Sequence, residues 1–313
     1  MSTSSAIQPL VTVVLCTYNG EKYLRPQLDS ILAQSWQHLE IIISDDGSTD
    51  STPAILEEYR QKDQRLRYQV NASNLGYNKN FEQAFQQAGA DFIAISDQDD
   101  IWEKKKIEIM MSHWTDASLF LYSLSGTFTD DDINKRKPAP TANYGPIRHL
   151  QQLVFNSPVH GHACIFHKKL LADCIPFPAD IYYDWWMSMH AARLSVINPV
   201  PQTLTWHRLH AANNSKTILS IADHAERNQQ LRKQFVHALQ TYLDRTGVQT
   251  ADEVFLEQYN GLIQTLDGKK ISWPLFRLIL RNRKMIFHYK KKKPLLILSQ
   301  IKHAFRMART GVL

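Results

Sequence analysis

Hydrophobic residues in the first hundred positions alternate between short continuous runs and repeats at helical spacing. The apolar, β-prone runs predict four buried strands, at residues 10–16, 39–44, 66–70 and 92–96. The helical repeats between them predict three helices, near residues 24–32, 51–61 and 78–88. Because strands and helices alternate with short connections, we expect an α/β fold with a mostly parallel central sheet flanked by helices.

The pattern changes in the rest of the chain. Residues 118–124 and 162–167 predict two more strands, residues 184–193 a short helix, and residues 129–146 and 199–216 two loops. From about residue 221 the spacing is helical, in segments near 221–244, 252–267, 274–289 and 295–309. We therefore expect an α/β domain over residues 1–217 and a helical, basic C-terminal extension over residues 218–313.

The net charge of +6 is unevenly distributed. After Asp267 the chain has 13 Lys and Arg residues and no acidic residue, which leaves 23 basic and 30 acidic residues before that point. A protein that tracks nucleic acid carries positive charge over its binding domain. The acidic α/β portion therefore argues against nucleic acid as a partner.

The basic C-terminal segment has a pattern typical of a helix on an anionic membrane surface. Four lysines, Lys290–Lys293, precede a segment in which Leu298, Ile301, Phe305 and Ala308 share one helical face. Lys302 lies off that face. The alternative is a solvated helix that packs one stripe against the core. An anionic membrane surface is thus an expected partner.

The location of the protein is predicted from three further features. The N-terminus lacks the basic and apolar regions of a signal peptide, and no apolar run approaches the roughly 20 residues that span a membrane. The three cysteines, Cys16, Cys164 and Cys174, are scattered and odd in number. We expect a cytoplasmic protein that is peripheral on the inner face of the membrane.

Polar residues follow three of the four predicted N-terminal strands. The carboxyl ends of parallel strands meet at one edge of a sheet, where ligands bind. The candidate residues at this edge are Thr17, Asn19, Asp45, Asp46, Asp97 and Asp99. Asp97 and Asp99 can hold Mn²⁺ or Mg²⁺, which prefer oxygen ligands and bridge to phosphates. The alternative for this pair is an acidic turn that caps a helix.

Three other positions could carry chemistry. Asp45 and Asp46 can accept hydrogen bonds from a pyrimidine base or a ribose, and the alternative is a turn with a helix N-cap. Asp184 lies among aromatic residues that would desolvate it and favour a general base, and the alternative is an N-cap. Arg208 could bind a phosphate and His210 a metal ion, and the alternative is a surface loop.

The segments VTVVLCTYNG, IIISDDGSTDST and FIAISDQDDIW resemble the family 2 glycosyltransferases, which have the GT-A fold. The resemblance covers about residues 9 to 215. The segments YDWW and WHRLHAANNS are similar to a bacterial rhamnosyltransferase-like branch, which builds surface polysaccharide and often uses dTDP-rhamnose. That branch usually has histidine where this chain has Tyr183.

The resemblance implies an inverting, metal-dependent transfer of a sugar from a dTDP- or UDP-sugar to a saccharide or lipid-linked acceptor. By position, Thr17 and Asn19 would line the nucleotide site, and Asp45, ahead of Asp46, would contact the base. Asp97 would lie near the ribose and the metal, Asp99 would be the main metal ligand, and His210 would reach the metal or the diphosphate. Asp184 matches the catalytic base of inverting members.

Two other functions fit parts of the sequence. A sugar-phosphate nucleotidyltransferase has a similar sheet, but it usually carries a glycine-rich phosphate loop, and none follows the first strand. A non-catalytic scaffold docked on the membrane would use only the basic C-terminal segment.

Overall fold

The structure is a computed structural model that describes residues 8–129, 132–139, 145–155, 157–210, 224–288 and 296–312. The predicted run Lys290–Lys293 lies outside these residues. Residues 211–216 of the predicted loop over 199–216 and the beginning of the predicted helix near 221 also lie outside them.

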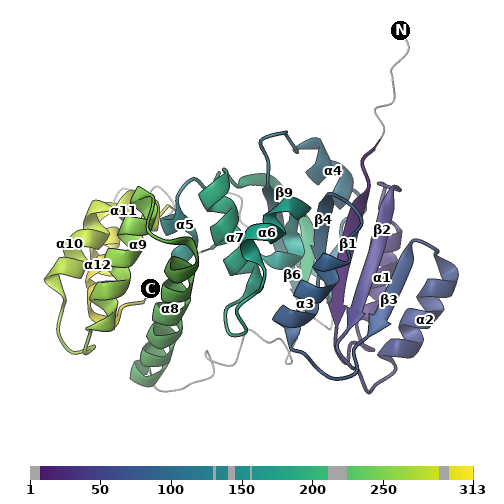
Figure 1. The fold of residues 1–313 in the computed structure, drawn as a ribbon, viewed down its shortest axis with the longest axis horizontal. Helices are drawn as coiled ribbons and strands as arrows, with labels where there is room; N and C mark the ends of the chain where they lie inside the picture. Colours follow the sequence, from purple (N-terminus) through teal and green to yellow (C-terminus); the bar gives the residue numbers. More distant parts are fainter. Residues whose placement is uncertain are drawn as a thin grey trace, which may run out of the picture. The chain divides into compact units, whose positions relative to one another are not determined.

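The first four strands form the parallel part of a sheet, in the order β3-β2-β1-β4. These strands are β1 (Val11–Thr17), β2 (Leu39–Asp45), β3 (Leu66–Val70) and β4 (Phe92–Ser96). Helices α1 (Leu24–Leu32), α2 (Thr52–Lys62) and α3 (Tyr77–Gln86) connect them (Figure 1). The α/β prediction for this region is confirmed.

The pattern of buried residues explains why this half of the sheet is readable in the sequence. All seven residues of β1 are buried, so the strand appears as a continuous apolar run rather than an alternating one. The N-terminal strands and α1 and α2 bury Leu15, Leu28, Ile43 and Ile55 in one core cluster. This core fixes the positions of the strands, and therefore the positions of the polar residues at and after their ends.

The rest of the sheet mixes parallel and antiparallel pairs. β8 (Cys164–His167) lies antiparallel to β4 and to β6 (Phe120–Thr129). β9 (Asn198–Leu209) lies parallel to β6 and antiparallel to the short β5 (Ile101–Trp102). β7 (Asp132–Lys137) pairs with β6.

Two predicted loops were wrong in part. β7 falls inside the predicted loop 129–146, and β9 occupies residues that were predicted as the beginning of the loop 199–216. The sequence of β9 lacks a clear apolar pattern because two of its buried residues, Thr205 and Arg208, are polar and form hydrogen bonds to other segments. Buried polar residues of this kind hide a strand from a search based on hydrophobicity.

Short elements connect the sheet strands. They are α4 (Lys106–Ser112), the 3₁₀ helices η2 (Gly161–Ala163) and η3 (Lys168–Leu170), α6 (Leu171–Cys174) and α7 (Tyr183–Leu194). The strand predicted near 162–167 and the helix predicted near 184–193 are confirmed as β8 and α7. η2 and the beginning of α7 contribute to the site below.

The chain divides into two compact units. The first contains the sheet, from the residues up to 141 and from 159–209, and the second takes residues 142–158 and those from 210 onward. The second unit consists of helices α5 (Leu150–Val154), α8 (His224–Thr246), α9 (Ala251–Gln264), α10 (Trp273–Arg281), α11 (Arg283–Ile286) and α12 (Leu296–Thr310) (Figure 1). None of the helices within the described residues has the length and apolar character that crossing a bilayer requires.

Candidate active site

The ends of β1 and β2 meet at one edge of the sheet, where Thr17 lies opposite Asp45 in the strand register. Asn19 follows β1 with a positive φ of 47°, a conformation that asparagine tolerates better than most residues. Its side-chain oxygen accepts a hydrogen bond from Thr49 N at 2.9 Å, and its backbone N donates to Ser48 Oγ at 2.7 Å. Asn19 therefore joins the two loops that follow these strands.

Asp45, the last residue of β2, and Asp46, the next residue, are both buried. Asp45 accepts hydrogen bonds from the hydroxyl and the backbone N of Ser48, at 2.5 and 2.9 Å. Burial raises the pKa of Asp45, and the bonds from Ser48 oppose that rise. Asp46 accepts bonds from the loop after β3, including the backbone N of Leu75 at 2.8 Å and of Gly76 at 3.0 Å. A nucleotide base at Asp45 would therefore have to replace a bond from Ser48.

Gln98 links the loop of Asp97 and Asp99 to the end of β1. Its side-chain oxygen accepts hydrogen bonds from Thr17 Oγ1 at 2.6 Å and from the backbone N of Tyr18 at 2.9 Å. The side chain of Asp97 remains 38% exposed, and Asp99 is partly buried. The loop that carries Asp97 and Asp99 is thus hydrogen-bonded, through Gln98, to Thr17 at the end of β1.

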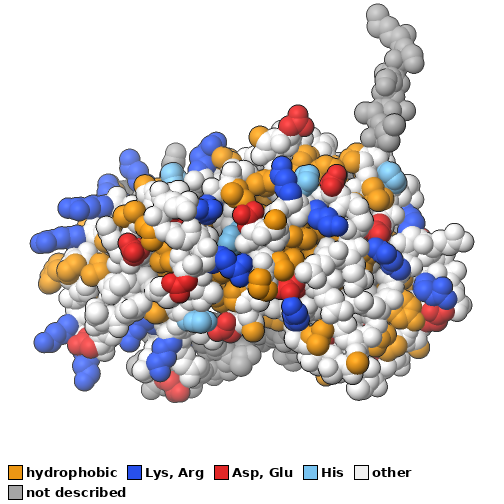
Figure 2. Space-filling model, viewed as in Figure 1, with side chains coloured by type: hydrophobic (Ala, Val, Ile, Leu, Met, Phe, Trp, Pro, Cys, Tyr) orange, Lys and Arg blue, Asp and Glu red, His pale blue; other side chains and the backbone are white. Residues whose placement is uncertain are grey.

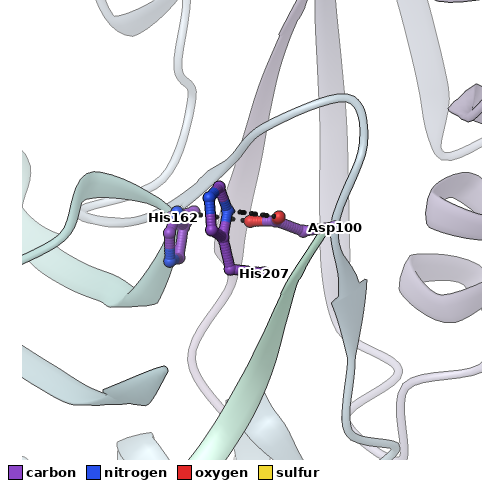
Figure 3. Close-up of side chains that lie close together, drawn as sticks. All are labelled: Asp100, His162 and His207. Carbon is purple, nitrogen blue, oxygen red and sulfur yellow. Dashed lines mark hydrogen bonds and ion pairs between the residues drawn. The ribbon is translucent and has the colours of Figure 1, made fainter. Parts of the chain in front are cut away.

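A third carboxylate, Asp100, is fully buried behind this loop. Its Oδ1 lies 3.0 Å from His207 Nδ1, and its Oδ2 lies 3.2 Å from His162 Nδ1 (Figure 3). Burial would raise the pKa of Asp100, but the two histidines outweigh it and lower the pKa. Burial would lower the pKa of His207, but its hydrogen bond to Asp100 and the negative charges of Asp100, Asp97 and Asp99 together outweigh this and raise the pKa to about 9.

Arg208 supports the same loop from β9. Its Nε donates to the backbone oxygen of Asp99 at 2.9 Å, and its backbone N donates to Asp100 at 3.2 Å. The guanidinium lies over the rings of Tyr23 and Phe128, with its central carbon 4.7 and 4.5 Å from their centroids. Arg208 is only 7% exposed, so the structure shows it holding the aspartate loop.

Asp184 lies at the beginning of α7 and faces η2. One carboxylate oxygen accepts from the backbone N of Gly161 at 3.1 Å, and the other from its neighbour Trp185 at 2.7 Å. Burial raises the pKa of Asp184, and the negative charge of Asp97 adds to the rise. The residue after Gly161, His162, has its Nδ1 3.3 Å from Asp97 Oδ2. Asp184 and Asp97 therefore both bond to η2, through Gly161 and His162 respectively.

Lys106 is buried beneath the histidine cluster. Its ammonium donates to the backbone oxygen of His162 at 2.6 Å and lies 3.6 Å from the ring centroid of Trp102. Burial lowers the pKa of Lys106 to about 7. The Lys106 side chain is therefore bonded to η2 through the backbone oxygen of His162.

The structure thus brings together most of the predicted site residues, from Thr17 to Arg208, and adds some that the sequence did not reveal. The additions are Gln98, Asp100, Lys106, His162 and His207. His210 begins the second unit and does not belong to the group of close ligand atoms. Gln98 and Asp100 stand in the quoted segment FIAISDQDDIW and His207 in WHRLHAANNS, whereas Lys106 and His162 had no sequence signal.

A parallel half-sheet that ends in polar loops, with aspartates gathered at its carboxyl edge, is the architecture of the GT-A glycosyltransferases. The chain belongs to a family with that activity. The model of "Glycosyl transferase family 2" matches residues 12–174, just over half of the chain. The protein is therefore a glycosyltransferase, as the resemblance implied.

Two curated relatives illustrate the similarity in sequence. An uncharacterised glycosyltransferase of Haemophilus influenzae is 27% identical over 77% of this chain and 76% of its own length. The putative teichuronic acid biosynthesis glycosyltransferase TuaG of Bacillus subtilis is 36% identical over 37% of this chain and 48% of its own length. The chain thus spans about half of TuaG.

Two solved structures show the same fold at low sequence identity. TarS of S. aureus, residues 1–349 in complex with UDP-GlcNAc, has a TM-score of 0.61 at 18% identity, covering 96% of this chain and 90% of that one. The mannosyltransferase PcManGT of Pyrobaculum calidifontis, in complex with GDP-Man and Mn²⁺, has a TM-score of 0.55 at 17% identity, covering 96% and 86%. The GT-A fold is confirmed.

Proposed function

We propose that the protein transfers a sugar, with inversion, from a dTDP- or UDP-sugar to a hydroxyl of a saccharide or lipid-linked acceptor. The observation that carries the proposal is that the short segment η2 binds both carboxylates, Asp184 through the backbone N of Gly161 and Asp97 through His162. A base and a donor-site carboxylate held by the same segment can serve the two ends of one displacement.

Asp97 and Asp99 suit a divalent ion at the donor diphosphate. Asp97 keeps 38% of its side chain exposed, and Asp99 is partly exposed, so their oxygens are accessible to the hard ions Mn²⁺ and Mg²⁺. When bound, such an ion neutralises charge that develops on the departing nucleoside diphosphate. The Mn²⁺ in the PcManGT complex supports this assignment.

Asp184 would remove the proton from the acceptor hydroxyl. Its raised pKa makes it a stronger base than an exposed aspartate, and the backbone bonds from Gly161 and Trp185 hold its carboxylate in one orientation. Deprotonation increases the nucleophilicity of the hydroxyl, which attacks the anomeric carbon from the face opposite the leaving group. Thr17 and Asn19 would line the nucleotide, and Asp45 would contact its base after Ser48 turns away.

The sugar and the acceptor are proposed from the sequence resemblance and from the name of one relative. The rhamnosyltransferase-like features make dTDP-rhamnose the first donor to test. The name of TuaG supports a role in surface polysaccharide synthesis. Lipopolysaccharide and other polymers that are assembled on lipid carriers supply acceptors of the required kind.

The experiment replaces Asp184 by Asn, which keeps its size. We expect the Asp184→Asn protein to bind nucleoside diphosphate normally and to lose transfer by about 10²–10⁴-fold, the usual worth of a general base. Asp173→Asn, at an exposed aspartate on α6, is the matched control. Transfer by Asp184→Asn at close to the wild-type rate would reject Asp184 as the base.

The second unit supports a peripheral position on an anionic membrane. Trp273, Ile297 and Leu298 are 55–60% exposed, and Trp273 contacts Phe276 and Phe305 ring to ring. Exposed basic residues belong to the same helices: Arg277, Arg281, Lys302, Arg306 and Arg309. Figure 2 shows Lys and Arg side chains projecting beside hydrophobic ones on this unit.

The packing of α12 differs from the predicted amphipathic face. Ala304, Met307 and Ala308 are buried, whereas Leu298 and Phe305 are exposed. Ala308 was therefore wrongly grouped with the outward apolar residues. The exposed apolar residues with basic neighbours nonetheless have the composition of an interfacial surface.

Vesicle sedimentation tests this part of the proposal. Each basic residue near an anionic surface is worth about 1 kcal/mol. Arg277→Gln with Arg281→Gln should therefore weaken binding to vesicles of phosphatidylglycerol and phosphatidylcholine by about 30-fold. The control is Lys233→Gln with Arg245→Gln, on α8. Binding that ignores the anionic lipid content would contradict the proposal.

A further inference from the structure

We propose that Asp100, His162 and His207 form a binding site for a transition-metal ion of the zinc class, separate from the ion at Asp97 and Asp99. One ligand atom from each of the three side chains lies within 4.8 Å of the others. Figure 3 shows both imidazole rings with a nitrogen directed at the Asp100 carboxylate. The inference goes beyond the proposed function, because this ion would bind without nucleotide.

The spacing of the ligand atoms suits a shared ion. His162 Nδ1 lies 3.2 Å from Asp100 Oδ2, and His207 Nδ1 lies 3.0 Å from Asp100 Oδ1. Ligand atoms bonded at about 2.0–2.1 Å to one tetrahedral ion lie about 3.3 Å from each other. The two imidazole rings are nearly parallel, with centroids 5.1 Å apart, so small side-chain rotations can admit an ion.

The donor set selects the kind of ion. Imidazole nitrogen favours zinc, cobalt and nickel, whereas magnesium prefers an all-oxygen shell. Two nitrogens and one carboxylate leave a fourth position for water. The His207 side chain is 27% exposed, which gives an ion a way in.

A buried oxygen supplies independent support. Asp100 is fully buried, and within the described part of the chain its Oδ2 accepts no hydrogen bond. His162 Nδ1 is aligned to bond Asp97 Oδ2, at 3.3 Å, and its contact with Asp100 Oδ2 is an ion pair without hydrogen-bond alignment. A proton on Nδ1 therefore serves Asp97 and leaves Asp100 Oδ2 unsatisfied, which is costly in a buried group. A cation between Nδ1 and Oδ2 satisfies both.

The other nitrogen of His162 has the partner that metal-binding histidines usually have. Its Nε2 lies 2.8 Å from the hydroxyl of Ser125 on β6. When Nε2–H donates to this hydroxyl, the lone pair remains on Nδ1, the atom that faces Asp100. Such outer-shell bonds fix the ring orientation and the tautomer of a ligand.

The ion would join three segments that are distant in sequence. Asp100 precedes β5, His162 belongs to η2, and His207 belongs to β9. Asp100 directly follows the loop of Asp97 and Asp99, and η2 holds Asp184 through Gly161. A bound ion would therefore fix the position of the loop of Asp97 and Asp99 relative to η2, the segment that orients Asp184.

Cobalt titration of the nucleotide-free, metal-stripped protein tests the site, with visible absorption as the readout. We expect one Co²⁺ per chain with the intense bands of a tetrahedral site, displaced by Zn²⁺ and not by Mg²⁺. His207→Gln should weaken this binding by at least about 10-fold, and Ser125→Ala by about 10–100-fold through the outer shell. Ser125→Ala also keeps the test decisive if His207→Gln fails to fold.

Two controls separate this site from its neighbours. His160→Gln removes a ring that stacks on His162, with centroids 5.7 Å apart, but lies outside the ligand group, and should retain Co²⁺ binding. Asp99→Ala should retain it as well. Loss of the bands in Asp99→Ala, equal affinity in His207→Gln, or no tetrahedral bands in the wild-type protein would overturn the proposal. None of these measurements uses nucleotide or sugar transfer, so their outcome does not depend on whether the proposed function is correct.

Discussion

Lys106 offers a quantitative test of the packing beneath the site. Its ammonium is fully buried and lies between the backbone oxygen of His162 and the ring of Trp102. Lys106→Met replaces the ammonium by an apolar end of similar length. The oxygen of His162 would keep a longer bond from Thr205 Oγ1, at 3.4 Å, so the variant does not leave that acceptor bare.

The magnitude follows from the pKa shift. Burial lowers the pKa of Lys106 from 10.5 to about 7, so between these values the unfolded chain binds more protons than the folded protein. The free energy of unfolding must then rise with pH across this window. For this single group the rise from pH 7 to pH 9 is about 2 kcal/mol, and the full cost of the buried charge at pH 7 is about 4 kcal/mol.

Urea unfolding of both proteins at pH 7 and pH 9 measures the effect. The difference in unfolding free energy between the two pH values should be about 2 kcal/mol more positive for the wild-type protein than for Lys106→Met. His207 and the other titrating groups contribute to both proteins and largely cancel. Equal pH dependence in the two proteins would refute the argument, because it would mean that Lys106 is neither desolvated nor titrating in this range.

Other residues of the site give three more tests. Burial raises the pKa of Asp184, so kcat/KM for transfer should fall on acidification at a pH above about 4, the ordinary range of a carboxyl group. A pH profile of kcat/KM that falls only at or below about pH 4 would contradict the role of Asp184 as base. Asp46→Ala removes the acceptor of three hydrogen bonds from the loop after β3, so urea titration should show a loss of about 2–4 kcal/mol. A loss below about 0.5 kcal/mol would show that other contacts hold this loop. Thr17→Val removes the donor to Gln98 at constant size and should lower stability by about 1 kcal/mol and weaken nucleotide binding. Unchanged stability would disprove the bond between the two loops, and unchanged calorimetric affinity would contradict the place of Thr17 in the nucleotide site.

The N-terminal half of the fold was predictable because its strands β1, β2 and β4 are buried on both faces, while β3 at the edge of the sheet is partly exposed. β1 and β2 consist almost entirely of buried residues, and α1 and α3 return to the sheet with regular apolar spacing. Thr17, Asp45 and Asp97 could be assigned to one edge from this alternation alone. Their side-chain partners could not, since Ser48 and Gln98 are polar residues in loops with no periodic signal.

β9 and the histidine cluster were not predictable for a related reason. His162 and His207 come together because β6 pairs with both β8 and β9, and that register is set by long-range contacts. β9 was predicted as part of the loop 199–216 because its buried positions include the polar residues Thr205 and Arg208. These residues form hydrogen bonds to other segments instead of packing as apolar side chains. The roles assigned to Arg208 and His210 as phosphate and metal residues remain predictions.

The most direct test of the central claim is calorimetric titration of UDP and dTDP into the purified protein, with and without Mn²⁺. The account predicts binding that requires Mn²⁺ and is lost in Asp99→Ala, with the tighter nucleotide identifying the donor pool to screen. Asp173→Asn should bind like the wild-type protein. If the folded protein bound neither nucleotide under any condition, the claim of a metal-dependent nucleotide-sugar site at this edge of the sheet would be contradicted.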